Sequence, residues 1–157
     1  MTLLRLPACI ALVVLTLAAS SVAQEKEKHI KRADLPTAVQ KAVDAQAQGA
    51  TVKGFSQEEE NGQTYYEVEM IVNGYTKDVL MDPTGAVVEV EEEVALDALP
   101  GAVKDGLQAR AGRGKLVKVE SLTKHDKLVA YEAQVRTSGK KSEVQVGPDG
   151  KPLDHEE

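Results

Sequence analysis

The sequence has few of the residues that usually carry catalysis or cross-linking. Its 157 residues include one cysteine, Cys9, one phenylalanine, no tryptophan and three histidines. A lone cysteine excludes an intrachain disulfide and a cysteine-based zinc site. His29, His125 and His155 are too far apart to form a local metal motif. No apolar run is long enough to cross a bilayer core about 30 Å thick.

Catalytic motifs are also lacking. No serine lies in a G-x-S-x-G elbow. The pattern S-x-x-K occurs at residues 121–124 and 138–141, but neither S-D-N nor K-T-G accompanies it. The glycines at 112 and 114 follow a predicted helix, whereas a phosphate loop precedes one. We therefore expect no enzyme, no catalytic residue, no cofactor and no metal site.

Acidic residues outnumber basic residues, 25 to 19, and the net charge is −6. This balance argues against nucleic acid or an anionic membrane as a partner. Two acidic runs, residues 58–60 and 89–93, lack the ligand spacing of a calcium loop. We interpret the first as a hairpin tip and the second as a solvated linker, with weak cation attraction as the alternative.

The N-terminus has the pattern of a secretory signal peptide. Arg5 precedes an uncharged stretch over residues 8–19, and Ser21 and Ala23 supply small residues at −3 and −1 of a cleavage site. We expect residues 1–23 to be removed near Ala23, with a secreted or periplasmic product and no stable membrane insertion afterwards. Losing Arg5 and no acid changes the charge from −6 to −6 − 1 = −7. Residues 24–32 mix both charge signs and predict a flexible lead-in.

One helix start occurs twice. Leu35-Pro36-x-Ala38-Val39 returns 64 residues later as Leu99-Pro100-x-Ala102-Val103. Proline suits the first turn of a helix, and Asp34 is the candidate N-cap of the first copy. Further landmarks recur 65 residues apart: Tyr66-Glu67 with Tyr131-Glu132, Gly74 with Gly139, Val79 with Val144, and Pro83-x-Gly85 with Pro148-x-Gly150.

Three strand-like segments come after each helix. They cover residues 51–55, 65–72 and 75–81 in the first copy, and 116–122, 129–136 and 141–146 in the second. Turn residues separate them, and several of them alternate in polarity with period two. The pattern predicts an α+β fold of two tandem αβββ repeats, residues 33–94 and 95–153, with a tail over 154–157. The helices should pack on one face of antiparallel β-sheets.

These motifs resemble the PepSY-like family. Leu-Pro-x-Ala-Val opening a helix, Tyr-Glu in a strand, and a strand closed by Pro-x-Gly are similar to its tandem, β-lactamase-inhibitor-like group. The resemblance covers residues 33–153. It implies a secreted or periplasmic location, an α+β fold with helices on one face of the sheet, and a protein-binding or protease-modulating role. It supplies no catalytic residues to carry over.

Alternation assigns the strand residues to two faces. The apolar positions kept by both copies should face the helices: Tyr66, Val68, Met70, Val72, Val79 and Met81, with Tyr131, Ala133, Val135, Val144 and Val146. The other face is mixed and charged, and such faces are often only solvated. We expect it to bind a partner through Lys53, Phe55, Tyr65, Glu67, Glu69, Leu116, Lys118 and Arg136.

The functional hypothesis is a secreted or periplasmic non-catalytic protein-binding module. It would inhibit or modulate a peptidase or another envelope protein. The alternative is a small-ligand or divalent-cation-responsive envelope protein, which the acidic runs and the net charge favour.

Overall fold

The computed structural model describes residues 27–60 and 62–157. The predicted signal peptide and its cleavage site lie outside these residues. The described chain forms one antiparallel sheet of eight strands, in the order β1 to β8, together with two α-helices. The predicted α+β class is confirmed, and the strands form one continuous sheet rather than two.

The elements succeed one another along the chain without crossovers in the sheet. They are β1 (Lys28–His29), the 3₁₀ helix η1 (Arg32–Asp34), α1 (Thr37–Gln46), β2 (Thr51–Glu60), β3 (Gln63–Val72), β4 (Tyr75–Met81), β5 (Val87–Glu93), α2 (Gly101–Ala111), β6 (Lys115–Lys124), β7 (Lys127–Thr137) and β8 (Lys140–Val146). Within the described residues, neither helix is long and apolar enough to cross a membrane.

Both helices begin directly after the proline of the repeated motif. Pro36 and Pro100 occupy the N-cap positions with the same φ of −54°, an angle to which the proline ring already restricts the backbone. The prediction that Asp34 caps α1 is wrong. Asp34 ends η1, and its carboxylate accepts a hydrogen bond from the Lys31 N–H at 3.0 Å.

Each helix packs through one stripe of aliphatic residues onto its own set of strands. In α1 the stripe is Val39 and Val43, and in α2 it is Val103 and Leu107, the i, i+4 spacing that places side chains on one face. The first core comprises Leu35, Val39, Val43, Val68, Met70, Val79 and Met81. The second comprises Leu99, Val103, Leu107, Leu116, Val119, Ala133, Val135 and Val146. Most of the positions predicted to face the helices therefore do so.

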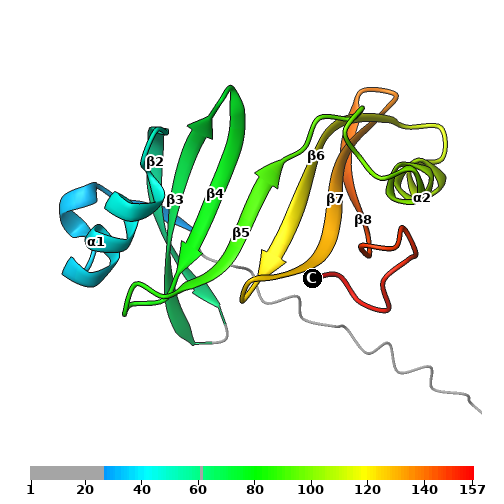
Figure 1. Ribbon diagram of the computed structural model, residues 1–157. Coiled ribbons are helices and arrows are strands. Elements are labelled where there is room, and N and C mark those ends of the chain that lie inside the picture. The colour runs from blue at the N-terminus through cyan, green and yellow to red at the C-terminus, as the bar shows by residue number, and fades with distance from the viewer. Residues whose placement is uncertain (1–26, 61) are drawn as a thin grey trace, which may run out of the picture.

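The sheet is strongly bent, and the helices lie on its outer side. In Figure 1, α1 flanks β2 and β3 at one end of the sheet and α2 flanks β8 at the other. The two cores are separate clusters, one beneath each helix. The face that neither helix covers lies inside the bend, and we call it the helix-free face.

Strand β5 joins the two helix-bearing parts. It pairs with β4 through Asp78 opposite Glu91, and with β6 through Glu91 opposite Leu122. The interpretation of this acidic run as a solvated linker is wrong. Valines and glutamates alternate from Val88 to Glu91, and period-two alternation of this kind is typical of a strand.

Two β-bulges reverse the expected orientation of two candidate residues. The register of β2 on β3 shifts between Val52 and Gly54, and Phe55 then lies opposite Val68 on the helix side. A second shift between Leu116 and Lys118 places Leu116 opposite Val135. Phe55 packs against the first core and Leu116 belongs to the second. The prediction that these two residues lie on the helix-free face is wrong, because a bulge inserts one residue and inverts the alternation.

Candidate functional site

The helix-free face of the central strands carries rows of carboxylates. Residues directly opposite one another in neighbouring strands share a face of the sheet. One row runs from Glu69 through Asp78 to Glu91, a second from Glu67 through Leu80 to Glu89, and a third from Glu93 through Glu120 to Glu132. Eight carboxylates therefore lie on the helix-free face between β3 and β7.

A cavity of about 290 Å³ lies over parts of the first two rows, and we call it the acidic groove. Its lining contains seven carboxylates, one lysine and one leucine. The lining residues are Glu58, Glu60, Glu67, Asp78, Leu80, Glu89, Glu91, Lys124 and Glu157. They come from five strands, β2 to β6, and from the C-terminal segment. The groove thus spans the region where the two helix-bearing parts meet.

The bend of the sheet makes the side chains converge. Asp78, Glu91 and Glu120 lie on three successive strands, and one carboxylate oxygen of each is within 4.8 Å of the others. Neighbouring strands are about 4.8 Å apart, so the backbones of β4 and β6 are roughly 10 Å apart. The three side chains can meet only because they project into the concave side.

Crowding and burial make Asp78 and Glu91 hard to ionise. Burial raises the pKa of Glu91 to about 8, and the charges of Glu120, Glu89 and Glu132 add to the effect. Burial, with the charges of Glu67 and Glu120, raises the pKa of Asp78 to about 6. Both shifts favour the protonated form, and the effect is larger for Glu91 than for Asp78.

Two of the surrounding acids are each held by a donor. Ser56 Oγ donates to Glu67 Oε2 at 2.9 Å, and Gln145 Nε2 donates to Glu132 Oε2 at 2.8 Å. Burial nevertheless raises the pKa of both Glu67 and Glu132. These hydrogen bonds fix the positions of the carboxylates without neutralising their charge.

Two lysines compensate part of the charge. Lys118 Nζ lies 2.6 Å from Glu120 Oε1, and Lys124 Nζ lies 3.5 Å from Glu89 Oε2. Glu120 is only 6% exposed. Seven lining carboxylates against one lining lysine leave the groove with an excess of negative charge, which attracts cationic groups.

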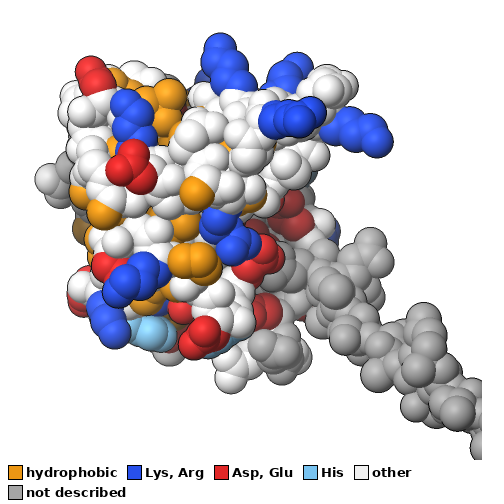
Figure 2. All heavy atoms as spheres, turned by 90° about the vertical axis from the view of Figure 1, so that its right-hand side faces the viewer, with side chains coloured by type: hydrophobic (Ala, Val, Ile, Leu, Met, Phe, Trp, Pro, Cys, Tyr) orange, Lys and Arg blue, Asp and Glu red, His pale blue; other side chains and the backbone are white. Residues whose placement is uncertain are grey.

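Positive charge gathers elsewhere on the surface. Figure 2 shows the side of α2 and β8, where Lys and Arg side chains project from the upper end. Lys115, Arg136 and Lys141 are exposed and lie side by side, because Arg136 pairs with both lysines across β6, β7 and β8. The surface is therefore not uniformly acidic, and the negative charge of the acidic groove is local.

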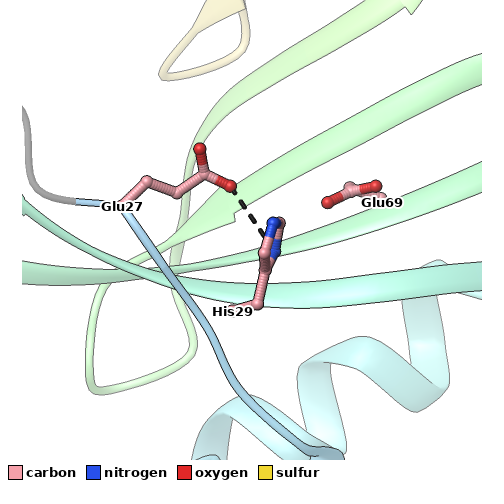
Figure 3. Close-up of side chains that lie close together, drawn as sticks. All are labelled: Glu27, His29 and Glu69. Carbon is pink, nitrogen blue, oxygen red and sulfur yellow. Dashed lines mark ion pairs between the residues drawn. The ribbon is translucent and has the colours of Figure 1, made fainter.

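A second group of potential ligands lies at the edge strand β1. Its two residues pair with β2, His29 opposite Ser56, so this part of the predicted lead-in is attached to the sheet. Figure 3 shows Glu27 and Glu69 flanking His29, with the Glu27 Oε1 to His29 Nδ1 distance at 3.7 Å. Glu69 extends over Gly54, where an added Cβ would lie 3.3 Å from its Oε1. Glu27 and His29 are largely exposed, and among the described residues the group has only these three members.

The structure distributes the predicted binding residues over several places. Glu67 lines the groove and Glu69 faces Asp78 beside it, whereas Lys118 reaches Glu120, two residues further along β6. The others lie outside the groove. Tyr65 lines a neighbouring recess, Lys53 is exposed at the bulge of β2, Arg136 lies between the exposed lysines of β6 and β8, and Phe55 and Leu116 lie on the helix side.

Several groove residues were not among the predicted binding residues, including Asp78, Glu89, Glu91 and Glu157. The sequence allows residues 86–90 to extend the strand pairing, and the alternation of Val88, Glu89, Val90 and Glu91 is the signal for the longer strand β5. Once β5 is placed between β4 and β6, its glutamates necessarily face Asp78 and Leu80. Nothing in the local sequence predicts that Glu157 reaches the same cavity.

Comparison with known proteins identifies the fold. No protein-family model matches the chain, and no curated protein matches it. A solved structure of a Bacteroides eggerthii protein described as periplasmic is 22% identical, with a TM-score of 0.62, and the match covers 76% of this chain and 86% of that one. A BLIP-like protein from Bacteroides fragilis is 22% identical, with a TM-score of 0.56 over 76% of this chain and 83% of its own.

A third similar structure is a DUF2874 family protein from Bacteroides ovatus. It is 21% identical, with a TM-score of 0.60, and the match covers 76% of this chain and 85% of that chain. Identities at this level show a shared fold and nothing about shared residues. The PepSY-like resemblance stays a prediction, although the presence of a BLIP-like protein among the structures of similar fold agrees with its second, β-lactamase-inhibitor-like, description.

Proposed function

We propose that this chain is a non-catalytic binding module whose acidic groove receives a lysine- or arginine-rich segment of another exported protein. The observation that carries the proposal is the groove lining, seven carboxylates and one lysine on the face that neither helix covers. A surface of one charge sign favours an occupant of the opposite sign and accelerates its association. This narrows the expected partner surface from a mixed, charged face with a few apolar residues to its acidic part.

A cationic side chain would stabilise the groove in its ionised form. Because burial and neighbouring carboxylates raise the pKa values of Asp78 and Glu91, ionising them costs free energy in the empty groove. An ammonium or guanidinium group between them offsets that cost, and a guanidinium can bind a carboxylate through two hydrogen bonds. Leu80, in the same lining, offers apolar surface to the aliphatic stem of lysine or arginine.

The size of the groove restricts the occupant. A cavity of about 290 Å³ is at the lower end of the range for ligand sites and holds a few side chains, not a folded domain. The partner should therefore present an extended basic segment or a loop, while the rest of its surface rests on the rim.

Binding of a fluorescein-labelled oligolysine peptide, measured by fluorescence anisotropy at fixed ionic strength, tests the proposal. The variant Asp78→Asn/Glu67→Gln removes two lining charges, and we expect its dissociation constant to rise at least about tenfold. The matched control Asp97→Asn/Asp105→Asn removes two charges that do not line the groove, and it should bind nearly as the wild type does. Equal affinities for both variants would refute the assignment.

A divalent cation is the competing occupant, favoured by the approach of Asp78, Glu91 and Glu120 to within 4.8 Å. Thermal melts with calcium or zinc separate the two hypotheses, since specific binding to the native state raises the melting temperature. A rise that Asp78→Asn abolishes, together with no oligolysine binding, would replace the peptide proposal by the cation alternative. Binding of oligolysine unaffected by calcium would favour the peptide.

The remaining expectations belong to the same proposal. We infer export through a signal peptide over residues 1–23, a secreted or periplasmic location, and two related units over residues 33–94 and 95–153. The shared Leu-Pro helix starts and the similar strand order after each helix support the last point. Whether binding inhibits or modulates a peptidase or another envelope protein is tested by assaying each captured partner with and without this chain.

A further inference from the structure

The C-terminal segment, residues 151–157, returns from β8 to the acidic groove. We infer that the end of this segment, which enters the groove through Glu157, is a displaceable occupant, so that the chain covers part of its own binding site until a cationic segment replaces it. The inference rests on the proposed function and concerns its regulation.

The path of the segment is set by a fixed turn. After β8, Gly150 N donates to Gly147 O and Gly147 N donates to Lys151 O, both at 2.8 Å. Gly150 rests against α2, where a Cβ on either Gly150 or Gly106 would overlap backbone atoms of the other element. The chain leaves this anchored turn without forming a further strand among the described residues, and Figure 1 shows it running back toward the lower ends of β6 and β7.

The end of the segment is held at two points, of which the second lies in the groove. Glu157 N donates to Gln145 Oε1 at 2.9 Å, and the same amide of Gln145 donates to Glu132. Glu157 Oε2 lies 3.8 Å from Lys124 Nζ, which also lies 3.5 Å from Glu89. Glu157 is therefore one of the lining residues, and it shares with Glu89 the single lysine of that lining.

The negative charge of the segment is repelled by the carboxylates of the groove. Glu157 adds a seventh carboxylate to the six that the strands supply to the lining. Burial raises the pKa of Glu132, and Glu156 is among the charges that raise it further. One backbone hydrogen bond and a long, partly exposed ion pair provide little stabilisation against this repulsion. Local opening of such a segment needs far less free energy than global unfolding.

A basic segment has the opposite charge and can replace these contacts favourably. An occupant that blocks a site lowers the apparent affinity by the fraction of molecules in which the site is open. Removing the occupant should therefore tighten binding of a cationic peptide, even though removal also deletes negative charge that would attract the peptide.

The test compares two variants of the full chain with the same formal charge loss. One ends at Pro152 and lacks residues 153–157. The other retains the segment but carries Asp154→Asn/Glu156→Gln/Glu157→Gln. We expect the shortened chain to bind fluorescein-labelled oligolysine roughly fivefold more tightly than the neutral-tail chain. Equal affinities, or weaker binding by the shortened chain, would overturn the inference.

This outcome is distinguishable from failure of the proposed function. If the proposed function is wrong, adding Asp78→Asn/Glu67→Gln to either variant does not weaken its binding of oligolysine. If only the regulation is wrong, both variants bind through Asp78 and Glu67 with the same dissociation constant.

A second readout does not depend on affinity. A nitroxide label at Asp154→Cys, in a chain with Cys9→Ser, should broaden the amide signals of β5 and β6 around Glu89 and Lys124. Added oligolysine should restore those signals. Absence of broadening in the peptide-free protein would contradict occupancy of the groove, and broadening that oligolysine leaves unchanged would contradict displacement.

Discussion

In each half of the molecule a glycine of the turn after the third strand contacts the backbone of the helix, and the contact is closer in the second half. In the first half (α1 with β2–β4) Gly85 lies beneath α1, and an added Cβ would be 2.7 Å from Ala38 O. In the second half (α2 with β6–β8) Gly150 lies beneath α2 and faces Gly106, where the first half has Ala42. The second helix lies so close that neither glycine tolerates a side chain. The comparison shows that both helices pack on the sheet through backbone contacts at glycines as well as through their buried aliphatic side chains.

The halves also differ in the segment that comes after this turn. After residues 82–85 the chain enters β5, which completes the sheet between β4 and β6. After residues 147–150 the described residues form no further strand, and the chain instead reaches the groove through Glu157. The groove thus lies where the halves meet, with Glu89 and Glu91 of β5 and Glu157 of the C-terminal segment in its lining.

The largest effect is expected from the glycines beneath the helices. Both have positive φ, +82° at Gly85 and +78° at Gly150, and both meet helix backbone. Gly150→Ala should lower the free energy of unfolding by about 4 kcal/mol, and Gly85→Ala by about 3 kcal/mol, measured by urea denaturation. Gly139→Ala has a similar φ of +84° with open space around it, so it should cost only about 1 kcal/mol. Equal costs at all three positions would show that close approach does not matter.

Truncating the two residues on the helix side tests the bulges. Leu116→Ala should cost about 3 kcal/mol because the side chain is buried in the second core, and Phe55→Ala about 2 kcal/mol because it is partly buried against the first. Val117→Ala, at a half-exposed position beside Leu116, should change stability little. If either truncation abolished oligolysine binding without loss of stability, the corrected side assignment would fail.

Two Gly→Ala substitutions in α2 should change the free energy of unfolding in opposite directions. Gly106→Ala adds helix propensity, yet its Cβ would overlap Gly150 O, so we expect a net loss of about 2 kcal/mol in chemical denaturation. Gly101→Ala, in the first turn of α2 with nothing within 4 Å of the added Cβ, should be neutral or stabilising by up to about 1 kcal/mol. Stabilisation by both substitutions would contradict the close contact between Gly106 of α2 and Gly150.

Removing one donor beneath the groove should have a smaller effect. Ser56 is fully buried and donates to Glu67, as Gln145 donates to Glu132 in the second half. Ser56→Ala should cost about 1 kcal/mol of unfolding free energy and raise the pKa of Glu67 further. Ser142→Ala, at an exposed position of β8, serves as the control. Carboxylate titration by NMR would show no change at Glu67 if the hydrogen bond were unimportant.

The last prediction concerns the dependence of stability on pH. The folded pKa of Asp78 is raised from 3.8 to about 6 and that of Glu91 from 4.5 to about 8, so the folded state binds these protons more tightly than the unfolded state. Stability should therefore fall as the pH rises from about 4, near the unfolded pKa values, through about 8, the folded pKa of Glu91, and level off only above that. Asp78→Asn/Glu91→Gln should flatten the slope of the melting temperature. If the slope of the melting temperature against pH did not change, groups other than Asp78 and Glu91 would be responsible for the pH dependence.

The sequence predicts the elements better than the surface they form. The Leu-Pro motif and the alternation of Val68, Met70, Val79 and Met81 suffice to place helices on one face of the sheet. They fail at Phe55 and Leu116, because a bulge leaves no clear mark in a period-two pattern. Val52 and Gly54 flank one such bulge, and only its glycine hints at irregularity.

The groove could be predicted only in part. Glu67 and Glu69 are placed by alternation, and their position on the helix-free face is confirmed. The convergence of Asp78 with Glu120 results from the bend of the sheet, a tertiary property that no local pattern carries. The place of Glu157 depends on the turn beneath α2 and on Gln145 in β8, contacts that alternation along the strands does not reveal.

The central claim is that a cationic segment binds where the two halves meet, on the face that the helices leave uncovered. Titrating unlabelled oligolysine into isotopically labelled protein and following backbone amide shifts tests it directly. We predict that the largest shifts map to β4, β5 and β6 around Asp78, Glu91 and Glu120, and that α1 and α2 change little. Shifts confined to the helices or to the outer face of the sheet, or no shifts at all, would contradict the account.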